Sequence, residues 1–262
     1  MNNINIRMLT TMEQLKQLQL VEQKVWAQPP TPTHQTFTIA QNGGVILGAY
    51  EHEQMVGFVY SFPGFDGEKT YLHSHMLGIL PTHRQGGLGE QLKLEQAKVG
   101  KKLGYTTMTW TFDPLESINA HLNIHKLRAV GAYYKENHYG SLKDGINQGL
   151  ATDRIHIKWD LLKDRSLPTA TFTTENVLLI RQSDGSPAYT QTFLHEFTNE
   201  QDQWFVAIPD DFQSIKQQNI SLAKQWREYS RNVFNQLFSS GYEAINVIRD
   251  EKDKLSYYMF KK

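Results

Sequence analysis

Hydrophobic residues recur along the first half of the chain in two patterns. A period of two is typical of strands, and a spacing of three or four is typical of helices. Helical spacing runs from Thr10 or Thr11, either of which is a candidate N-cap, to about Trp26. Extended patterns predict strands at residues 4–9, 45–50, 55–62, 71–80 and 105–112, and helical patterns predict helices at residues 86–102 and 117–127. The prolines at positions 29, 30 and 32 argue against regular structure around them.

The second half of the chain repeats this mixture of elements. Its patterns predict strands at residues 132–134, 154–162, 177–180, 203–208 and 245–248, and one long helix at residues 215–240. A segment rich in Thr, Ser and Asp, residues 163–174, has the composition of a linker. We therefore expect a domain over residues 1–164 and a C-terminal α/β lobe over residues 175–262.

The order strand, proline, helix, Gly-Tyr, strand occurs twice, once around Pro81 and once around Pro209. This leaves two interpretations open, a degenerate half-repeat and a chance similarity of common strand-helix-strand units. Pro209 is followed by Asp210 and Asp211, whose carboxylates disfavour a phosphate site in the second copy. We expect the lobe to shape an acceptor pocket or an oligomer contact, with a homodimer as the candidate assembly.

Composition and charge exclude several classes of function. The 27 basic and 27 acidic residues balance, so no overall field favours nucleic acid or an anionic membrane. Cysteine is absent, which excludes disulfides, thiolate nucleophiles and cysteine-based metal sites. The first residues lack the build of a signal peptide, and no apolar run reaches the roughly 20 residues of a membrane span. We expect a cytoplasmic location.

The most informative segment runs from Leu77 to Leu92, where a strand passes through a proline into a glycine-rich turn and then a helix. A turn at a helix N-terminus exposes backbone N–H groups and the positive end of the helix dipole, which suits a diphosphate. Arg84 adds a fixed charge beside that turn. Glu90 and Gln91 follow Gly89 where a P-loop requires Lys and then Ser or Thr. Leu92 likewise breaks the GxGxxG dinucleotide fingerprint.

The run Arg84-Gln85-Gly86-Gly87-Leu88-Gly89 resembles the R/Q-x-x-G-x-G/A signature of the GNAT acyltransferase superfamily. The order of elements over residues 4–162 is also similar to that family. The resemblance implies a mixed, mostly antiparallel sheet flanked by helices, with acetyl-CoA or another acyl-CoA as co-substrate. It implies cofactor contacts along the strand and turn, at Leu77, Ile79, Arg84, Gln85, Gly86, Gly87, Leu88 and Gly89, with an amide from Asn119 or Asn123 near the pantetheine.

The same resemblance implies direct transfer of the acyl group to an amine of a small molecule or protein. Candidates for the general base are Asp113, Glu116, His73 and His75. A histidine is close to neutral at physiological pH, which suits this role. The family's later motif aligns poorly, with Ile124 where a thiolate-protonating tyrosine is usual. The candidates to replace that tyrosine are His121, His125, Tyr133, Tyr134 and water.

Two further hypotheses compete with a transferase. The alternative is a GNAT-like protein that binds acyl-CoA as a sensor without transferring the acyl group, because the later motif is weak. The third hypothesis is a scaffold protein in which the glycine turn is fortuitous. His121 and His125 lie four residues apart on a predicted helix and could together ligate zinc. No glutamate completes an HExxH motif and no third ligand is evident, so we expect no metal.

Overall fold

The computed structural model describes residues 4–26, 28–84, 86–140 and 149–262. Its contacts divide the chain into two compact units, which are described separately. The first unit contains the described residues up to Trp110 together with Trp159–Lys163, and the second contains those of Thr111–Lys158 and Asp164–Lys262. The boundaries between the units fall after residues 110, 158 and 163, and the last of them lies inside segment 163–174. Independent folding of residues 1–164 stays a prediction.

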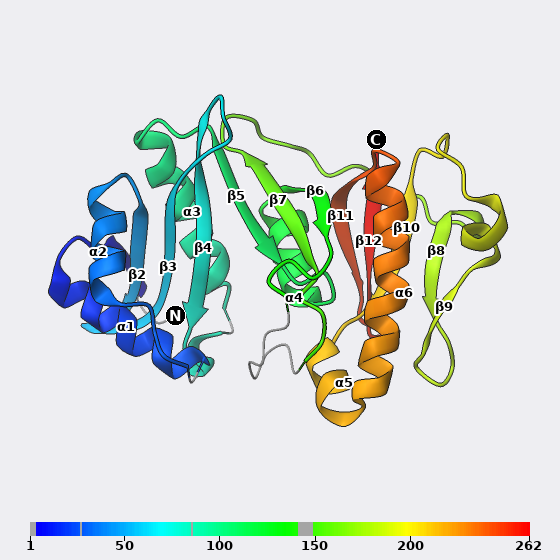
Figure 1. The fold of residues 1–262 in the computed structure, drawn as a ribbon, viewed down its shortest axis with the longest axis horizontal. Coiled ribbons are helices and arrows are strands. Elements are labelled where there is room, and N and C mark those ends of the chain that lie inside the picture. Colours follow the sequence, from blue (N-terminus) through cyan, green and yellow to red (C-terminus); the bar gives the residue numbers. More distant parts are fainter. Residues whose placement is uncertain (1–3, 27, 85, 141–148) are drawn as a thin grey trace. The chain divides into compact units, whose positions relative to one another are not determined.

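The first unit is a sheet with helices on both faces (Figure 1). Its elements are β1 (Ile4–Met8), α1 (Met12–Trp26), α2 (Thr33–Gln41), β2 (Val45–Glu51), β3 (Gln54–Phe65), β4 (Thr70–Ile79), α3 (Leu88–Lys102) and the first part of β5 (Thr107–Phe112). The strand order is β1-β2-β3-β4-β5. Neighbouring strands are antiparallel except β4 and β5, which are parallel. This arrangement confirms the predicted fold class.

Helices α1 and α2 cover one face of this sheet and α3 covers the other (Figure 1). Leu15, Leu18 and Val21, at helical spacing on α1, pack against the buried Phe58 and Tyr60 of β3. Helix α2 was not predicted, because the prolines before it argue against regular structure. Pro32 is instead the N-cap residue of that helix, a place where a missing N–H does no harm.

A β-bulge interrupts β4 and changes which residues share a face. Tyr60 of β3 pairs with Met76, but the next residue, Ser61, pairs with Ser74, so His75 is an extra residue on β4. A regular strand over residues 71–80 would place His73, His75, Leu77 and Ile79 on one face, and the bulge breaks this alternation. The extra residue shifts the alternation by one position, and His73 and Leu77 lie on opposite faces.

The second unit is also built on a sheet, with strand order β7-β6-β11-β12-β10-β8-β9. Its strands are β6 (Val130–Lys135), the first part of β7 (Arg154–Asp160), β8 (Val177–Arg181), β9 (Pro187–Tyr189), β10 (Trp204–Pro209), β11 (Glu243–Asp250) and β12 (Leu255–Lys261). Its α-helices are α4 (Ser117–Ala120), α5 (Phe212–Gln218) and α6 (Ile220–Ser239), and π-helical residues His121–Lys126 extend α4. Strand pairs are antiparallel except β8 with β10.

Two expectations about this unit need correction. The predicted long helix is two helices, because Asn219 adopts a non-helical conformation and its side chain caps α6 by accepting from the Leu222 N–H at 3.0 Å. Strand β12, which was not predicted, lies between β10 and β11. In the first unit β4 and β5 are direct neighbours, so the two similar segments do not occupy equivalent positions in their sheets.

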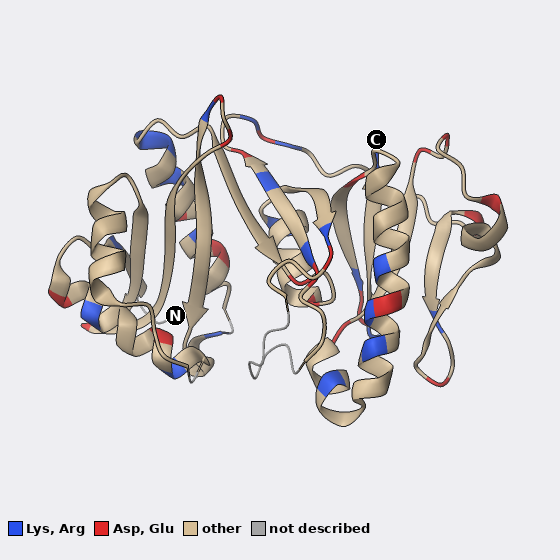
Figure 2. Ribbon diagram, viewed as in Figure 1, with Lys and Arg blue, Asp and Glu red and all other residues tan. Residues whose placement is uncertain are grey.

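None of the helices among the described residues is both long and apolar enough to cross a membrane. Lys and Arg alternate with Asp and Glu over both units, and several of the basic residues lie along α5 and α6 (Figure 2).

Candidate functional site

The edge of β4 beyond the bulge is open on the side of β5. The parallel pairing recorded between these strands consists of Leu72 with Met108 and His73 with Thr109. The N–H of Leu80 donates to the Val56 carbonyl of β3 at 2.9 Å. Because backbone groups alternate in direction along a strand, those of Leu77 and Ile79 point away from β3. Two of the predicted cofactor residues thus present backbone groups to the open edge.

The glycine turn follows this edge directly. Gly86 and Gly87 have φ values of 102° and 77°, a region that side chains strain, and Gly87 is the N-cap of α3. The first bond from the helix to the cap runs from the Gln91 N–H to the Gly87 carbonyl at 3.1 Å. The N–H groups of Leu88, Gly89 and Glu90 therefore have no earlier helical carbonyl to bind. Predicted residue Gln85 lies outside the described residues.

Arg84 connects the turn to the strand. Its Nε donates to the Ile79 carbonyl at 3.1 Å, while the residue as a whole is exposed. This bond confirms that the Ile79 carbonyl points away from β3. It also fixes the guanidinium at the end of β4, four residues before α3 begins at Leu88.

His75 is the bulged residue, two positions before Leu77. Its ring centroid lies 5.6 Å from that of Tyr60 and 5.5 Å from that of Phe62. Burial against neighbouring groups lowers the pKa of His75 below its ordinary 6.5, although part of the residue is exposed. The imidazole is therefore neutral at physiological pH and can accept a proton. The neighbouring His73 is held by its Nδ1, which lies 2.9 Å from the Thr109 hydroxyl.

Two polar residues on the inner face of α3 were not among the predicted site residues. Lys93 is 4% exposed and Gln96 is 0% exposed, and both fall within the buried stripe that includes Leu92 and Ala97. The Lys93 ammonium lies 3.4 Å from the centroid of the Trp110 ring. Their position in an otherwise apolar helical stripe is the sequence signal that could have identified them.

Replacing Lys93 with methionine is expected to stabilise the protein at neutral pH. Burial lowers the pKa of Lys93 well below 10.5, so between the folded pKa and 10.5 the unfolded chain binds one more proton than the folded chain. Over that window the wild type gains about 1.4 kcal/mol of stability per pH unit as pH rises. Urea titrations at several pH values should show an advantage for the variant that shrinks toward pH 10.5. A variant that is less stable than the wild type at pH 7 would refute the conclusion that the folded protein disfavours the charged form of Lys93.

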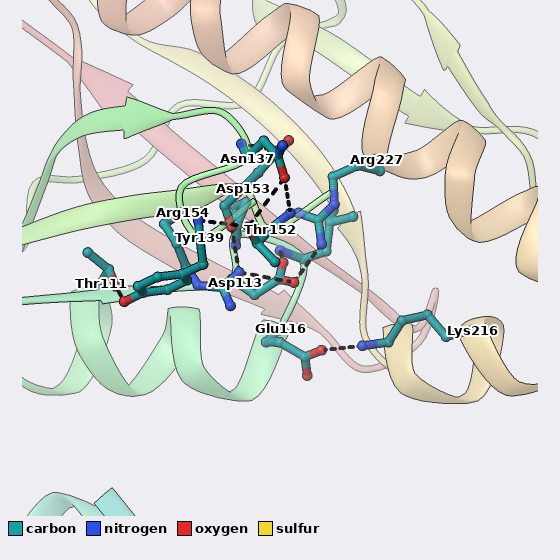
Figure 3. A network of polar contacts seen from close by, with 12 residues as sticks. Thr111, Asp113, Glu116, Asn137, Tyr139, Thr152, Asp153, Arg154, Lys216 and Arg227 are labelled. Atoms are coloured by element: carbon teal, nitrogen blue, oxygen red, sulfur yellow. Dashed lines mark hydrogen bonds and ion pairs between the residues drawn. The ribbon is translucent and has the colours of Figure 1, made fainter. Parts of the chain in front are cut away.

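The second unit contains the remaining catalytic candidates, and each has partners there (Figure 3). Asp113 directly follows β5 and accepts from the Arg227 guanidinium, with Arg154 at 3.9 Å. Burial alone would raise the pKa of Asp113, but the charge and hydrogen bond of Arg227 and the charge of Arg154 lower it overall. A carboxylate stabilised in this way is a weak proton acceptor.

Glu116 is the N-cap residue of α4 and has the opposite electrostatics. Its carboxylate accepts from Gln213 and from Lys216, whose ammonium lies 3.4 Å away and whose side chain is 1% exposed. Burial, followed by the nearby charge of Asp113, raises the pKa of Glu116 despite these donors. Of the two carboxylates, Glu116 is the better candidate for a base.

Tyr134 donates its hydroxyl to Asp153, a carboxylate with 0% exposure. Arg231 also donates to Asp153, from Nε at 2.9 Å and from Nη2 at 2.8 Å. Burial and the Asp153 charge raise the pKa of Tyr134 far above its ordinary value, so its proton is hard to release.

The other predicted residues of this unit have varied environments. Asn119 is exposed on α4, whereas Asn123 and Ile124 are buried. The rings of His121 and His125 stack at 4.4 Å, and their Nδ1 atoms lie near the Val247 carbonyl and the Asn246 side chain. Among the described residues, no three His, Cys, Asp or Glu side chains cluster closely enough to hold a metal.

Comparison with known proteins identifies relatives of the N-terminal part. Residues 11–122 match the acetyltransferase (GNAT) family. The chain is similar to yncA from Salmonella typhimurium, which was solved with its cofactor acetyl-CoA. The identity is 16% and the TM-score is 0.50, and the match covers 64% of this chain and 99% of that chain. The ribosomal-protein-S18-alanine N-acetyltransferase from Escherichia coli gives 16% identity and a TM-score of 0.50, with 65% and 100% covered. These likenesses show the fold alone. No curated protein matches the chain.

Proposed function

We propose that the chain transfers an acyl group from acyl-CoA to an amine acceptor, because residues 11–122 match the acetyltransferase (GNAT) family. The observation that carries this proposal is the open edge of β4 leading directly into a helix N-terminus within one unit. The backbone groups of Leu77 and the N–H of Ile79, which point away from β3, suit the amides of the pantetheine arm. The N–H groups of residues 88–90 and the Arg84 guanidinium suit the pyrophosphate.

The proposed reaction is a direct attack on the thioester. The acceptor nitrogen bonds to the carbonyl carbon, the bond from that carbon to sulfur breaks, and CoA leaves as a thiolate. We propose His75 as the base that takes the proton from the acceptor nitrogen. Its imidazole is neutral, and it lies on β4, the strand whose backbone is proposed to bind the pantetheine. Glu116, whose pKa is raised, is the second candidate base. Asp113 and Tyr134 are better suited to holding the second unit together.

Thiol release from acetyl-CoA and longer acyl-CoAs, measured over a panel of small amines and peptide N-termini, tests this proposal. We expect turnover with at least one acceptor, and transfer confirmed by mass spectrometry of the product. A chain that binds CoA but releases no thiol with any amine would refute the transferase.

A binding or sensor protein is the second candidate, and one observation favours it. Ile124, at the place of the family's tyrosine, is fully buried, and the Tyr134 hydroxyl is already donated to Asp153. The described residues therefore offer no accessible tyrosine at these two positions to protonate the thiolate. Tight acyl-CoA binding without turnover would support this alternative.

A further inference from the structure

Lys93 and Gln96 lie at a defined level along β4. The Ser74 hydroxyl donates to the side-chain amide oxygen of Gln96 at 2.8 Å. One turn further along the helix, a Cβ at Gly100 would lie 3.0 Å from the Leu72 side chain. Helix α3 therefore runs antiparallel to β4. Lys93 precedes Gln96 by about one helical turn, which places it level with residues 75–77. This is the stretch where the bulge ends and the open edge begins.

The Lys93 amine also lies where β4 and β5 stop pairing. The last recorded pair joins His73 to Thr109, and Trp110 is the next residue of β5. Lys93 lies over the ring of this tryptophan. Cofactor bound with its pyrophosphate at the turn and its pantetheine along Ile79 and Leu77 would bring its acyl group to this level.

The Gln96 side chain has a donor that the described residues leave unused, and the Lys93 amine lies over the Trp110 ring. Gln96 Nε2 is buried without a hydrogen-bond partner. Among the described residues no carboxylate forms an ion pair with Lys93, and burial lowers its pKa. An amide NH₂ and an amine are both donors, and one of them can carry a positive charge. The ligand group that complements them is a carboxylate.

We propose that Lys93 and Gln96 bind a carboxylate at the end of the acyl chain, so that the donor is a dicarboxylic acyl-CoA such as succinyl-CoA. This inference rests on the proposed function, because it assumes the cofactor site at Arg84 to Gly89. An acetyl group ends in a methyl and offers these donors nothing beyond the thioester oxygen. A terminal carboxylate supplies acceptors for both and a counter-charge for the lysine.

Donor selectivity tests the proposal. The ratio of kcat/KM for succinyl-CoA to that for acetyl-CoA should exceed about ten in the wild type, since a charge-assisted hydrogen bond contributes roughly tenfold to hundredfold. Lys93→Met should bring the ratio toward one. Gln96→Glu, which gives Lys93 an internal partner and repels the ligand, should lower it below one. Lys98→Met is the matched control, because Lys98 is exposed on the same helix, and should leave the ratio unchanged.

Proton uptake gives a readout that a purely structural role would not produce. At a pH between the lowered pKa of Lys93 and 10.5, binding of succinyl-CoA should take up protons as Lys93 becomes charged, as measured by calorimetry in two buffers of different ionisation enthalpy. Uptake should be absent with free CoA and with Lys93→Met.

The possible outcomes separate this inference from the function on which it rests. If free CoA and acetyl-CoA bind but succinyl-CoA is not preferred, the carboxylate site is wrong and the acyl-CoA site stands. If Lys93→Met lowers kcat/KM equally for succinyl-CoA and acetyl-CoA, the Lys93 amine binds the thioester oxygen that both donors share, and the proposal is overturned. No binding of any CoA compound would overturn both.

Discussion

Arg227→Met is expected to lower the free energy of unfolding by about 3 to 5 kcal/mol, because it leaves a buried carboxylate without its main partner. The Arg227 side chain is 5% exposed and that of Asp113 is 12% exposed. Arg154, at 3.9 Å, only partly compensates the charge that remains. The pair joins the end of β5 to α6, so its loss should loosen the second unit. Urea unfolding followed by tryptophan fluorescence measures the effect.

Two control variants separate charge from packing. Adding Asp113→Asn to Arg227→Met removes the uncompensated charge and should recover much of the lost stability. Arg7→Met breaks an exposed ion pair with Glu53 and should change stability little. A small loss in Arg227→Met, with no recovery in the double variant, would show that this pair does not hold the unit together.

His75→Gln is expected to lower kcat by about 10² to 10⁴-fold, the usual contribution of a general base. Glutamine keeps a similar polar shape but cannot take a proton. In the wild type kcat/KM should rise with pH through an apparent pKa below 6.5 and then level off, because the imidazole must be neutral. The variant should lose this acid limb in a pH-rate profile.

His73→Gln and Glu116→Gln are the matched comparisons. His73 is bonded to Thr109, and its replacement should have a smaller effect than that of His75. If Glu116→Gln abolishes the acid limb while His75→Gln retains it, the base is Glu116 and the assignment to His75 is incorrect.

The glycine turn could be found from sequence because its chemistry is local. Gly86 and Gly87 have positive φ values, and the helix begins where the turn ends. The β-bulge at His75 could not be predicted in this way, because a bulge is a property of the pairing between two strands. The sequence of β4 alone fits a regular alternation equally well, so it does not reveal the extra residue.

The partners of the predicted catalytic residues come from distant parts of the chain. Asp113 meets Arg227 and Glu116 meets Lys216, each about a hundred residues away. Charge periodicity within one element cannot reveal such pairs. The break between α5 and α6 at Asn219 could not be predicted for another reason. The helical spacing of apolar residues continues from one helix to the next, although Asn219 itself is not helical.

Calorimetric or thermal-shift titration with CoA, acetyl-CoA, ATP and NAD tests the acyl-CoA site most directly, with Arg84→Glu measured in parallel. A ligand at about 100 times its dissociation constant adds roughly 2.7 kcal/mol to the stability of the folded state. We predict stabilisation by CoA and acetyl-CoA, none by ATP or NAD, and a loss of the CoA effect in Arg84→Glu with its unliganded stability preserved. No stabilisation by CoA, or equal stabilisation of the variant, would contradict a cofactor site at the end of β4.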